Sequence, residues 1–354
     1  MNFLENGSVL IAEQIARAIA GGNRELTLTG AYEIASAIRL PSNFTLILSN
    51  CHLRMADGVY DNMFVNEHHG TELGRTVDGT DRNIKILGRG KAILDGGTYN
   101  GLSEKTSETN GLPHISKNNL LLFTNVEGFE IGHIACHNQR WWALNFVYAR
   151  NGHLHDIHFQ SNDTCIDENG NIYHCMKRDT YKDVLVKNSD GIDLRQGCHD
   201  ILIERLSGFT EDDTVALTNL NGKTEQWYGV PELTRDICNI TIKHVHAAAY
   251  CSIIRLLNQG ALKLHDIIIE DVQDTSLTCP SLDHGRYALR VGDANHLYGD
   301  RHSTAEETYN ISINGVNGRG LAVLHLAGEI GNLTLENIEA LEERTVLIED
   351  YRTK

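Results

Sequence analysis

The chain has 354 residues, of which 41% are hydrophobic, and it contains 32 glycines but only 4 prolines. This is enough apolar material for one large core, and no Pro-, Ser- or Gly-rich linker interrupts it, so we expect a single domain over residues 1–354. The formal net charge of −16 argues against nucleic acid as a partner, because phosphate contacts require clustered Lys and Arg.

The first expected element is a short helix near the N-terminus. Residues 9–20 (VLIAEQIARAIA) place Ile11 and Ile15 on one face at helical spacing, and two glycines follow as a stop signal. We expect residues 1–24 to form a helical cap that closes one end of the fold. An ordinary surface helix would show the same pattern.

The N-terminal sequence also predicts a cytoplasmic protein. It lacks the basic start and continuous apolar stretch of a secretory signal, although a secreted chain whose signal had been removed would look the same. No apolar run reaches the roughly 18 residues of a membrane span. The eight cysteines are scattered, as expected of reduced and mostly buried thiols.

From residue 25 onward one pattern recurs, an Asn or Asp followed by alternating apolar residues. Examples are Asn239-Ile-Thr-Ile, Asp266-Ile-Ile-Ile, Asn310-Ile-Ser-Ile and Asn332-Leu-Thr-Leu. The spacings of 27 and 22 residues within these pairs match one coil of a parallel β-helix. A β-sandwich would need hairpins, yet no Asn-Gly turn links apolar runs at hairpin spacing. The sequence therefore predicts an all-β fold, a right-handed parallel β-helix (solenoid) over residues 25–354.

Three polar, poorly periodic insertions interrupt this pattern at residues 98–117, 162–179 and 219–235. Loops of this length in a compact fold are commonly functional. The last two flank the acidic motifs described next, and we expect them to wall a cleft. Trp227 lies in the third insertion, where its ring would stack on a sugar or pack within the loop.

Two acidic motifs lie about one coil apart, at residues 188–190 (Asn-Ser-Asp) and 211–213 (Glu-Asp-Asp). Neighbouring parallel strands are about 4.8 Å apart, so stacked coils would bring Asp190 next to Asp212 and Asp213. Hydrolysis of a glycosidic bond needs one carboxylic acid to protonate the leaving oxygen and a second carboxylate to activate water or attack carbon. A calcium site, or ordinary turn aspartates, would show the same residues.

The two motifs, with Asp190 and Asp212 separated by 22 positions, resemble the NTD and DD signatures of glycoside hydrolase family 28. These are the polygalacturonase-like, pectin-degrading β-helix enzymes. Residues 90–97 (GKAILDGG) are similar to the family's G-x-IDG-x-G segment, and residues 140–142 (RWW) stand where it carries S-P-x-W. The resemblance extends over roughly residues 25–340.

This resemblance implies an inverting reaction in which Asp212 is the general acid and Asp190 with Asp213 holds and activates the water. We expect the three to share an exposed groove, with acid and base carboxylates roughly 6.5–9.5 Å apart. Asn188, as part of the first motif, and Trp227, as an aromatic beside the cleft, are candidate substrate contacts.

The sequence departs from the family pattern at two further binding positions. Tyr250 stands where the family's G-H-G motif has its histidine, and we treat it as a substrate contact. Arg290 matches the arginine of R-I-K, which grips a substrate carboxylate, whereas the lysine position is Gly292. A rhamnogalacturonan-type, modified or neutral glycoside therefore stands beside a galacturonate as the expected substrate.

The 18 histidines do not form a recognisable metal motif in the sequence. Strand alternation places His153 and His155 on one face, but neither has a carboxylate or a second pair at ligand spacing. We expect solvent-facing ladder residues there, no metal site and no cofactor.

Together these features predict a glycosidase acting on a pectin-like or related oligosaccharide, with exo-action favoured by the insertions near the cleft. The alternatives are a β-helical polysaccharide lyase or epimerase, and a non-catalytic carbohydrate-binding protein. The expected partner is an oligosaccharide, with neither nucleic acid nor membrane. The sequence leaves the oligomeric state open, a homo-oligomer included.

Overall fold

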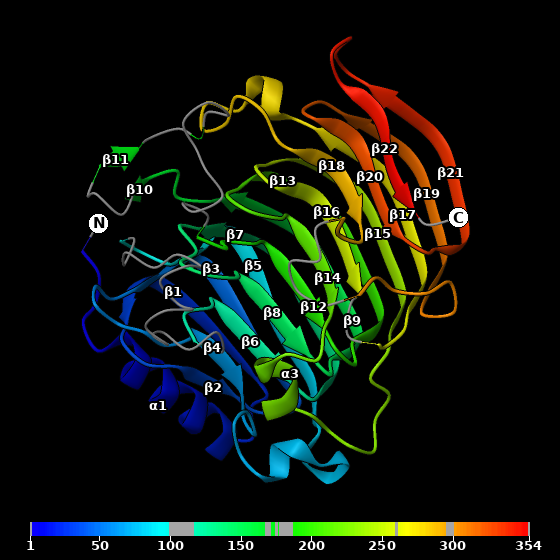
Figure 1. The fold of residues 1–354 in the computed structure, drawn as a ribbon. Helices are drawn as coiled ribbons and strands as arrows, with labels where there is room; N and C mark the ends of the chain where they lie inside the picture. The colour runs from blue at the N-terminus through cyan, green and yellow to red at the C-terminus, as the bar shows by residue number, and fades with distance from the viewer. Residues whose placement is uncertain are drawn as a thin grey trace.

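The structure is a computed structural model that describes residues 2–98, 117–166, 171–173, 176, 187–258, 261–294 and 301–352. Two parallel sheets of ten strands each run side by side along one axis, and the chain alternates between them coil after coil (Figure 1). The predicted right-handed parallel β-helix is therefore confirmed. The two ends of the chain lie at opposite ends of the β-helix.

Sheet A contains β1 (Glu25–Ile34), β3 (Phe44–Met55), β5 (Asp81–Asp95), β7 (Val126–His137), β9 (Arg150–Gln160), β13 (His199–Thr210), β15 (Ile237–Ala249), β17 (Leu264–Asp274), β19 (Thr308–Gly318) and β21 (Gly331–Ala340). Sheet B contains β2 (Ile38–Leu40), β4 (Phe64–Asn66), β6 (Leu121–Thr124), β8 (Leu144–Val147), β12 (Ile192–Arg195), β14 (Val215–Asn219), β16 (Ser252–Asn258), β18 (Tyr287–Val291), β20 (Ala322–Gly328) and β22 (Val346–Arg352). The other elements among the described residues are α1 (Gly7–Ala20), α3 (Lys223–Trp227), the antiparallel pair β10 (Cys165–Ile166) and β11 (Ile172–Tyr173), and the 3-10 turns η1 (Leu73–Arg75), η2 (Val77–Gly79) and η4 (Ser276–Thr278).

The core is built by like residues stacking from coil to coil. Ile240 and Ile242 of β15 pair in register with Ile267 and Ile269 of β17, and all four side chains are fully buried. The isoleucines at the same register of β19 continue the stack. Alternate residues along each strand face inward, because successive side chains of a strand point to opposite faces. The alternating runs in the sequence are thus the inner surface of the β-helix.

The Asn or Asp before each run has a backbone role. φ is 54° at Asn239, 56° at Asp266 and 53° at Asn310, which is the left-handed region. Asn and Asp adopt this conformation more readily than other non-glycine residues. Their side chains also form a ladder, since Asn310 Nδ2 donates to Asp266 Oδ1 and Asn332 Nδ2 donates to Asn310 Oδ1, both over 2.9 Å. The repeated residue therefore sets the same bend in successive coils.

Helix α1 caps the N-terminal end of the β-helix, as predicted from residues 9–20 (Figure 1). Ile11 and Ile15 on its apolar face join the main core. Burying this face shields the first coil from water. Within the described part of the chain, no helix is long and apolar enough to cross a bilayer.

The six cysteines whose side chains the structure describes are free thiols, and four of them are buried. Burial raises the pKa of Cys51 and of Cys198 to about 12. These thiols therefore stay protonated near neutral pH and act as small apolar side chains in the core.

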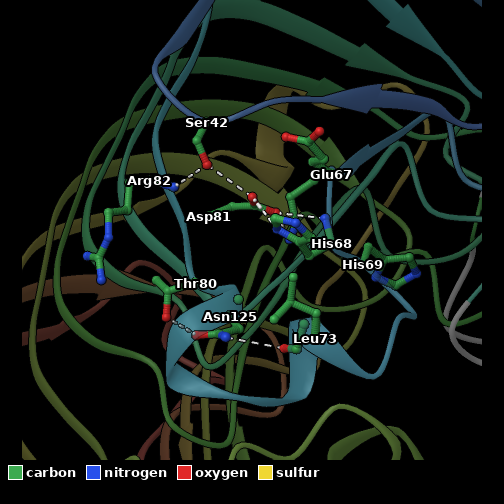
Figure 2. Close-up of polar contacts among 12 residues, drawn as sticks. Ser42, Glu67, His68, His69, Leu73, Thr80, Asp81, Arg82 and Asn125 are labelled. Carbon is green, nitrogen blue, oxygen red and sulfur yellow. Dashed lines mark hydrogen bonds and ion pairs between the residues drawn. The ribbon is translucent and has the colours of Figure 1, made fainter.

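A buried carboxylate fixes the loop that precedes β5, as Figure 2 shows. Asp81 accepts hydrogen bonds from Ser42 Oγ (3.0 Å), Asn66 Nδ2 (2.7 Å) and the backbone N–H of His68 (2.9 Å). In addition, Nδ1 of His68 lies 2.9 Å from Asp81 Oδ1. Asn125 holds the adjacent η1–η2 segment by donating to two of its carbonyls, over 2.8 and 3.2 Å. His68 is thus engaged in a structural network.

Candidate active site

The two acidic motifs occupy equivalent positions on consecutive coils, directly before β12 and β14. Ile192 of β12 pairs in register with Val215 of β14. The backbone N–H of Gly191 donates to the carbonyl of Asp213 over 2.9 Å, which extends the pairing into the turns. Parallel pairing therefore sets Asp190 beside Asp213.

The structure brings together the three carboxylates singled out in the sequence. One oxygen of each of Asp190, Asp212 and Asp213 lies within 4.8 Å of the others. The three residues are only 4%, 7% and 2% exposed. The described residues around them therefore do not form the open groove that we expected. The closest spacing also falls below the roughly 6.5–9.5 Å expected for an inverting pair. The two motifs lie on adjacent coils whose strands pair in register, and this pairing brings the carboxyl groups close together.

Glu211 holds the first motif in place, a role that the sequence pattern does not reveal. Its side chain is fully buried. Oε1 accepts from the backbone N–H of Lys187 (2.9 Å) and Oε2 from that of Ser189 (3.1 Å). The backbone N–H of Glu211 in turn donates to Ser161 Oγ over 3.1 Å. The carboxylate therefore fixes the turn that presents Asp190.

A fourth carboxyl group, Asp193, joins the cluster from β12. Burial, followed by the charges of Asp193, Asp212 and Asp213, raises the pKa of Asp190 well above its usual range. Burial also raises the pKa of Asp193 to about 7, although Arg195 opposes the shift. Like charges this close cannot all ionise, so the cluster retains a proton near neutral pH. A retained proton is what a general acid requires.

Three arginines lie along the cluster on sheet B. Arg195 of β12 is 3.8 Å from Asp193 Oδ1, and Arg255 of β16 is in register with Arg290 of β18. Arg255 Nη1 lies 3.6 Å from Asp213 Oδ2, and Arg255 Nη2 lies 3.6 Å from Asp293 Oδ2. Arg290 Nη2 pairs with Asp293 Oδ1 over 2.9 Å. Arg290 is thus linked to the cluster through Asp293 and Arg255. Sequence reasoning missed Arg255 because it lies two coils beyond Asp190 and outside both motifs.

The backbone favours glycine at position 292, where the family resemblance would place a lysine. The φ of Gly292 is 73°, in the left-handed region that favours glycine. A Cβ built at this position would lie 2.3 Å from the carbonyl oxygen of Ala327. A lysine at position 292 would therefore require this part of the coil to move.

Asn188 and α3 are connected through an aromatic and ionic network. Asn188 Oδ1 accepts from Trp142 Nε1 over 3.0 Å. The Arg195 guanidinium lies 3.8 Å from the centre of a Trp142 ring, and Nη1 of Arg195 donates to Glu225 Oε1 of α3 over 2.7 Å. This buried ion pair anchors α3 on the outer face of sheet B. Trp227 ends α3 and is 50% exposed.

Tyr250 lies in a small apolar cluster beside the acidic site. It is 6% exposed and packs with Phe209, Met176 and Leu282. Burial, followed by the charges of Asp212 and Asp213, raises the pKa of the thiol of its neighbour Cys251. The position of Tyr250 supports packing, and its contact with substrate stays a prediction.

Of the three insertions, the third is described throughout its backbone. The Tyr228 ring lies 4.8 Å from the His69 ring, and Val230 packs against Val65 and Leu122 on the outer face of sheet B. This segment therefore covers the sheet beside the site. Most of the first insertion (residues 99–116), and residues 167–170, 174–175 and 177–179 of the second, lie outside the described residues.

No protein-family model matches the sequence, and no curated protein matches it. Among solved structures, the chain is similar to a hyperthermoactive exopolygalacturonase from Thermotoga maritima, at 12% identity and a TM-score of 0.55 over 98% of this chain and 88% of that one. It is also similar to a 1,3-α-1,4-β-D-galactose-4-sulfate-3,6-anhydro-D-galactose-2-sulfate 4-galactohydrolase, at 10% identity and a TM-score of 0.55 over 99% and 87%. At these identities the likeness establishes a polygalacturonase-like β-helix fold.

Proposed function

We propose that the chain is a family 28-type glycoside hydrolase that cleaves a pectin-like or related oligosaccharide. The observation that carries this proposal is the meeting of Asp190, Asp212 and Asp213 within 4.8 Å on consecutive coils. An exopolygalacturonase and a galactohydrolase share the fold over nearly the whole chain, which supports a carbohydrate substrate.

In the proposed reaction, Asp212 gives its proton to the leaving oxygen as the glycosidic bond breaks. Asp190 and Asp213 orient a water molecule, whose oxygen bonds to the anomeric carbon while one of the two carboxylates takes its proton. Burial, followed by the nearby like charges, raises the pKa of Asp190 and so keeps a proton within the cluster. We propose that this proton resides on Asp212 when substrate is bound. Solvent exchange then restores the starting protonation.

We propose inversion at the anomeric carbon on the strength of the family resemblance. The spacing does not add support, because the nearest oxygens lie within 4.8 Å and retaining enzymes have carboxyl groups roughly 5–5.5 Å apart. Proton NMR during turnover separates the two outcomes, since the first anomer formed is inverted or retained before mutarotation. If the first product retains the anomeric configuration, one of the aspartates attacks the anomeric carbon as a nucleophile and does not activate water.

The surroundings of Arg290 are the basis for the substrate preference that we propose. Arg290 is ion-paired with the buried Asp293, and no lysine accompanies it at position 292. This weakens the positive field that a galacturonate carboxylate would need, and it favours a neutral or modified sugar at the cleavage subsite. We propose exo-action as well, supported by the segment around α3 that covers sheet B beside the site.

Incubation with a panel of pectic, rhamnogalacturonan and neutral plant oligosaccharides tests the proposal. A hydrolase adds one reducing end for each bond cleaved, and an exo-acting one releases only short products from one end. Ultraviolet absorbance from an unsaturated product would instead identify a lyase. Saturable binding without any product would leave a carbohydrate-binding protein and overturn the enzymatic assignment.

A further inference from the structure

A second cluster of potential ligands lies on sheet A and shares no residue with the acidic motifs. Glu130 of β7, with His153 and His155 of β9, offers one oxygen and two nitrogens that lie within 4.8 Å of one another. We propose that these three residues bind a divalent transition-metal ion of the zinc class. Two imidazoles and one carboxylate form a donor set that zinc uses in proteins, with a fourth position left for water. The proposal is independent of the glycosidase assignment.

Neighbouring coils assemble the cluster. β7 and β9 are adjacent parallel strands, with Glu130 in register with His153 and Gly132 in register with His155. The imidazole of His155 lies directly over Gly132, where an added Cβ would be 2.3 Å from Cε1 of the ring. The absence of a side chain at Gly132 therefore makes room for His155, which is 7% exposed.

The ring of His155 is oriented as a ligand. Its Nδ1 lies 2.7 Å from Asp156 Oδ2, an arrangement that fixes the tautomer and leaves the lone pair on Nε2. Nε2 lies 3.4 Å from Glu130 Oε1, which is long for a hydrogen bond. Two ligand atoms at about 2.0–2.1 Å from a tetrahedral zinc would be separated by about 3.3 Å. The spacing thus fits a shared ion better than a direct contact.

The supporting charges hold the cluster in shape. His153 Nε2 lies 3.0 Å from Glu204 Oε1, and its ring centre lies 4.2 Å from that of His155. Arg205 pairs with both Asp156 (2.9 Å) and Glu204 (2.6 Å), so one guanidinium positions both outer carboxylates. Lys85 Nζ pairs with Glu130 Oε2 over 2.7 Å, which leaves Oε1 to face the histidines. Because Lys85 and Arg205 already balance these carboxylates, we expect metal binding to be reversible.

Two other histidine groups serve as contrasts. His133 lies 3.7 Å from Asp156 Oδ2, but the 2.7 Å contact between Asp156 and His155 is too short for two ligands of one ion. His246 shares a single Asp271 oxygen with a neighbouring histidine, and its side chain is 49% exposed. We assign neither His133 nor His246 to the site.

Isothermal titration with Zn²⁺, after chelator treatment and dialysis of the full chain, tests the assignment. We expect one Zn²⁺ per chain in the wild type, and a Co²⁺-loaded sample should show the strong visible absorption of a tetrahedral site. Glu130→Gln and His153→Ala should lower the affinity at least about 100-fold, more than the roughly 10–100-fold typical of losing a supporting partner such as Asp156. His133→Ala and His246→Ala should bind as the wild type does.

Gly132→Ala provides a test that removes no ligand, because the added methyl group would displace the His155 ring. It should weaken Zn²⁺ binding while far-ultraviolet circular dichroism shows an intact fold. The same spectrum checks that each ligand variant is folded. Wild-type affinity in both Glu130→Gln and His153→Ala, or loss of binding in His133→Ala, would overturn the assignment.

Discussion

Oδ1 of Asp190 accepts a hydrogen bond from the backbone N–H of Asp213 over 3.1 Å, although the two residues are 23 positions apart. The bond crosses from one coil of the β-helix to the next. It couples the placement of a proposed catalytic carboxylate to the register of the strands that follow. Changes in coil register should therefore affect activity as well as stability.

The role of Asp212 can be separated from that of its neighbours by the leaving group. Asp212→Asn removes a proton donor at nearly constant size, so kcat on the natural linkage should fall on the order of 10²–10⁴-fold. The loss should shrink on an aryl glycoside, because that group departs without protonation. Asp213→Asn is the matched control and should lose activity on both substrates, since water must still be activated. If Asp212→Asn loses as much activity on the aryl glycoside as on the natural linkage, Asp212 is not the acid, and Asp190 or Asp213 has that role.

Glu211 is predicted to act through position alone. Glu211→Gln leaves one oxygen to accept two backbone N–H groups and turns an amide toward the other, which should cost about 1–3 kcal/mol of unfolding free energy. Activity should fall without any change in the pH profile, because Glu211 does not exchange protons with substrate. Urea unfolding and the pH dependence of kcat/KM measure both effects, with the exposed Glu336→Gln as control. A shifted profile would place Glu211 in the chemistry.

Stability should depend on pH through Asp193. Its folded-state pKa of about 7 exceeds the unfolded value of about 3.9, so its contribution is present below pH 4 and is lost as the pH rises toward 7. Asp193→Asn mimics the protonated form. Unfolding in urea should thus give similar stability to the wild type below about pH 4, and a gain that grows with pH to on the order of a few kcal/mol at pH 8.

Asp271 supplies a control of opposite sign for this measurement. The hydrogen bond from His244 lowers the pKa of Asp271 to about 2, so its contribution is present above the unfolded pKa and is lost on acidification. Asp271→Asn should therefore destabilise, or leave unchanged, the protein at pH 8. A gain at pH 8 in both variants would show a general charge effect and contradict the assignment to Asp193.

Arg290 is predicted to grip substrate without taking part in bond cleavage. Arg290→Ala should raise KM more than it lowers kcat, because a uniform binding contact is lost. Arg290→Lys keeps the charge beside Asp293 and should recover part of the affinity. Steady-state kinetics on the best substrate of the panel gives the answer. A fall in kcat at constant KM would assign Arg290 to the transition state.

The fold was accessible from sequence because one local feature repeats. Residues such as Asn310 and Asn332 mark the same left-handed bend in successive coils, and the apolar runs after them are the core. The meeting of Asp190 with Asp213 followed from the same spacing. Both inferences need only the coil length, which sequence reveals.

Features that depend on outward-facing side chains were not accessible in this way. His155 lies beside Glu130 because β7 and β9 pair in one particular register. No sequence pattern in either segment predicts that register. The same holds for Arg255 beside Asp213. The burial of Asp190 depends on how several coils and loops close over it, which local patterns do not encode.

The incorporation of solvent oxygen tests the central claim most directly. Digestion in oxygen-18 water, followed by mass spectrometry, should show one labelled oxygen at each new reducing end for the wild type. The Asp190→Asn variant keeps an oxygen that can accept from Asp213 but cannot take a proton from water, so it should form labelled product far more slowly. Products without the label, or labelled product formed at the wild-type rate by Asp190→Asn, would contradict hydrolysis by this carboxylate cluster.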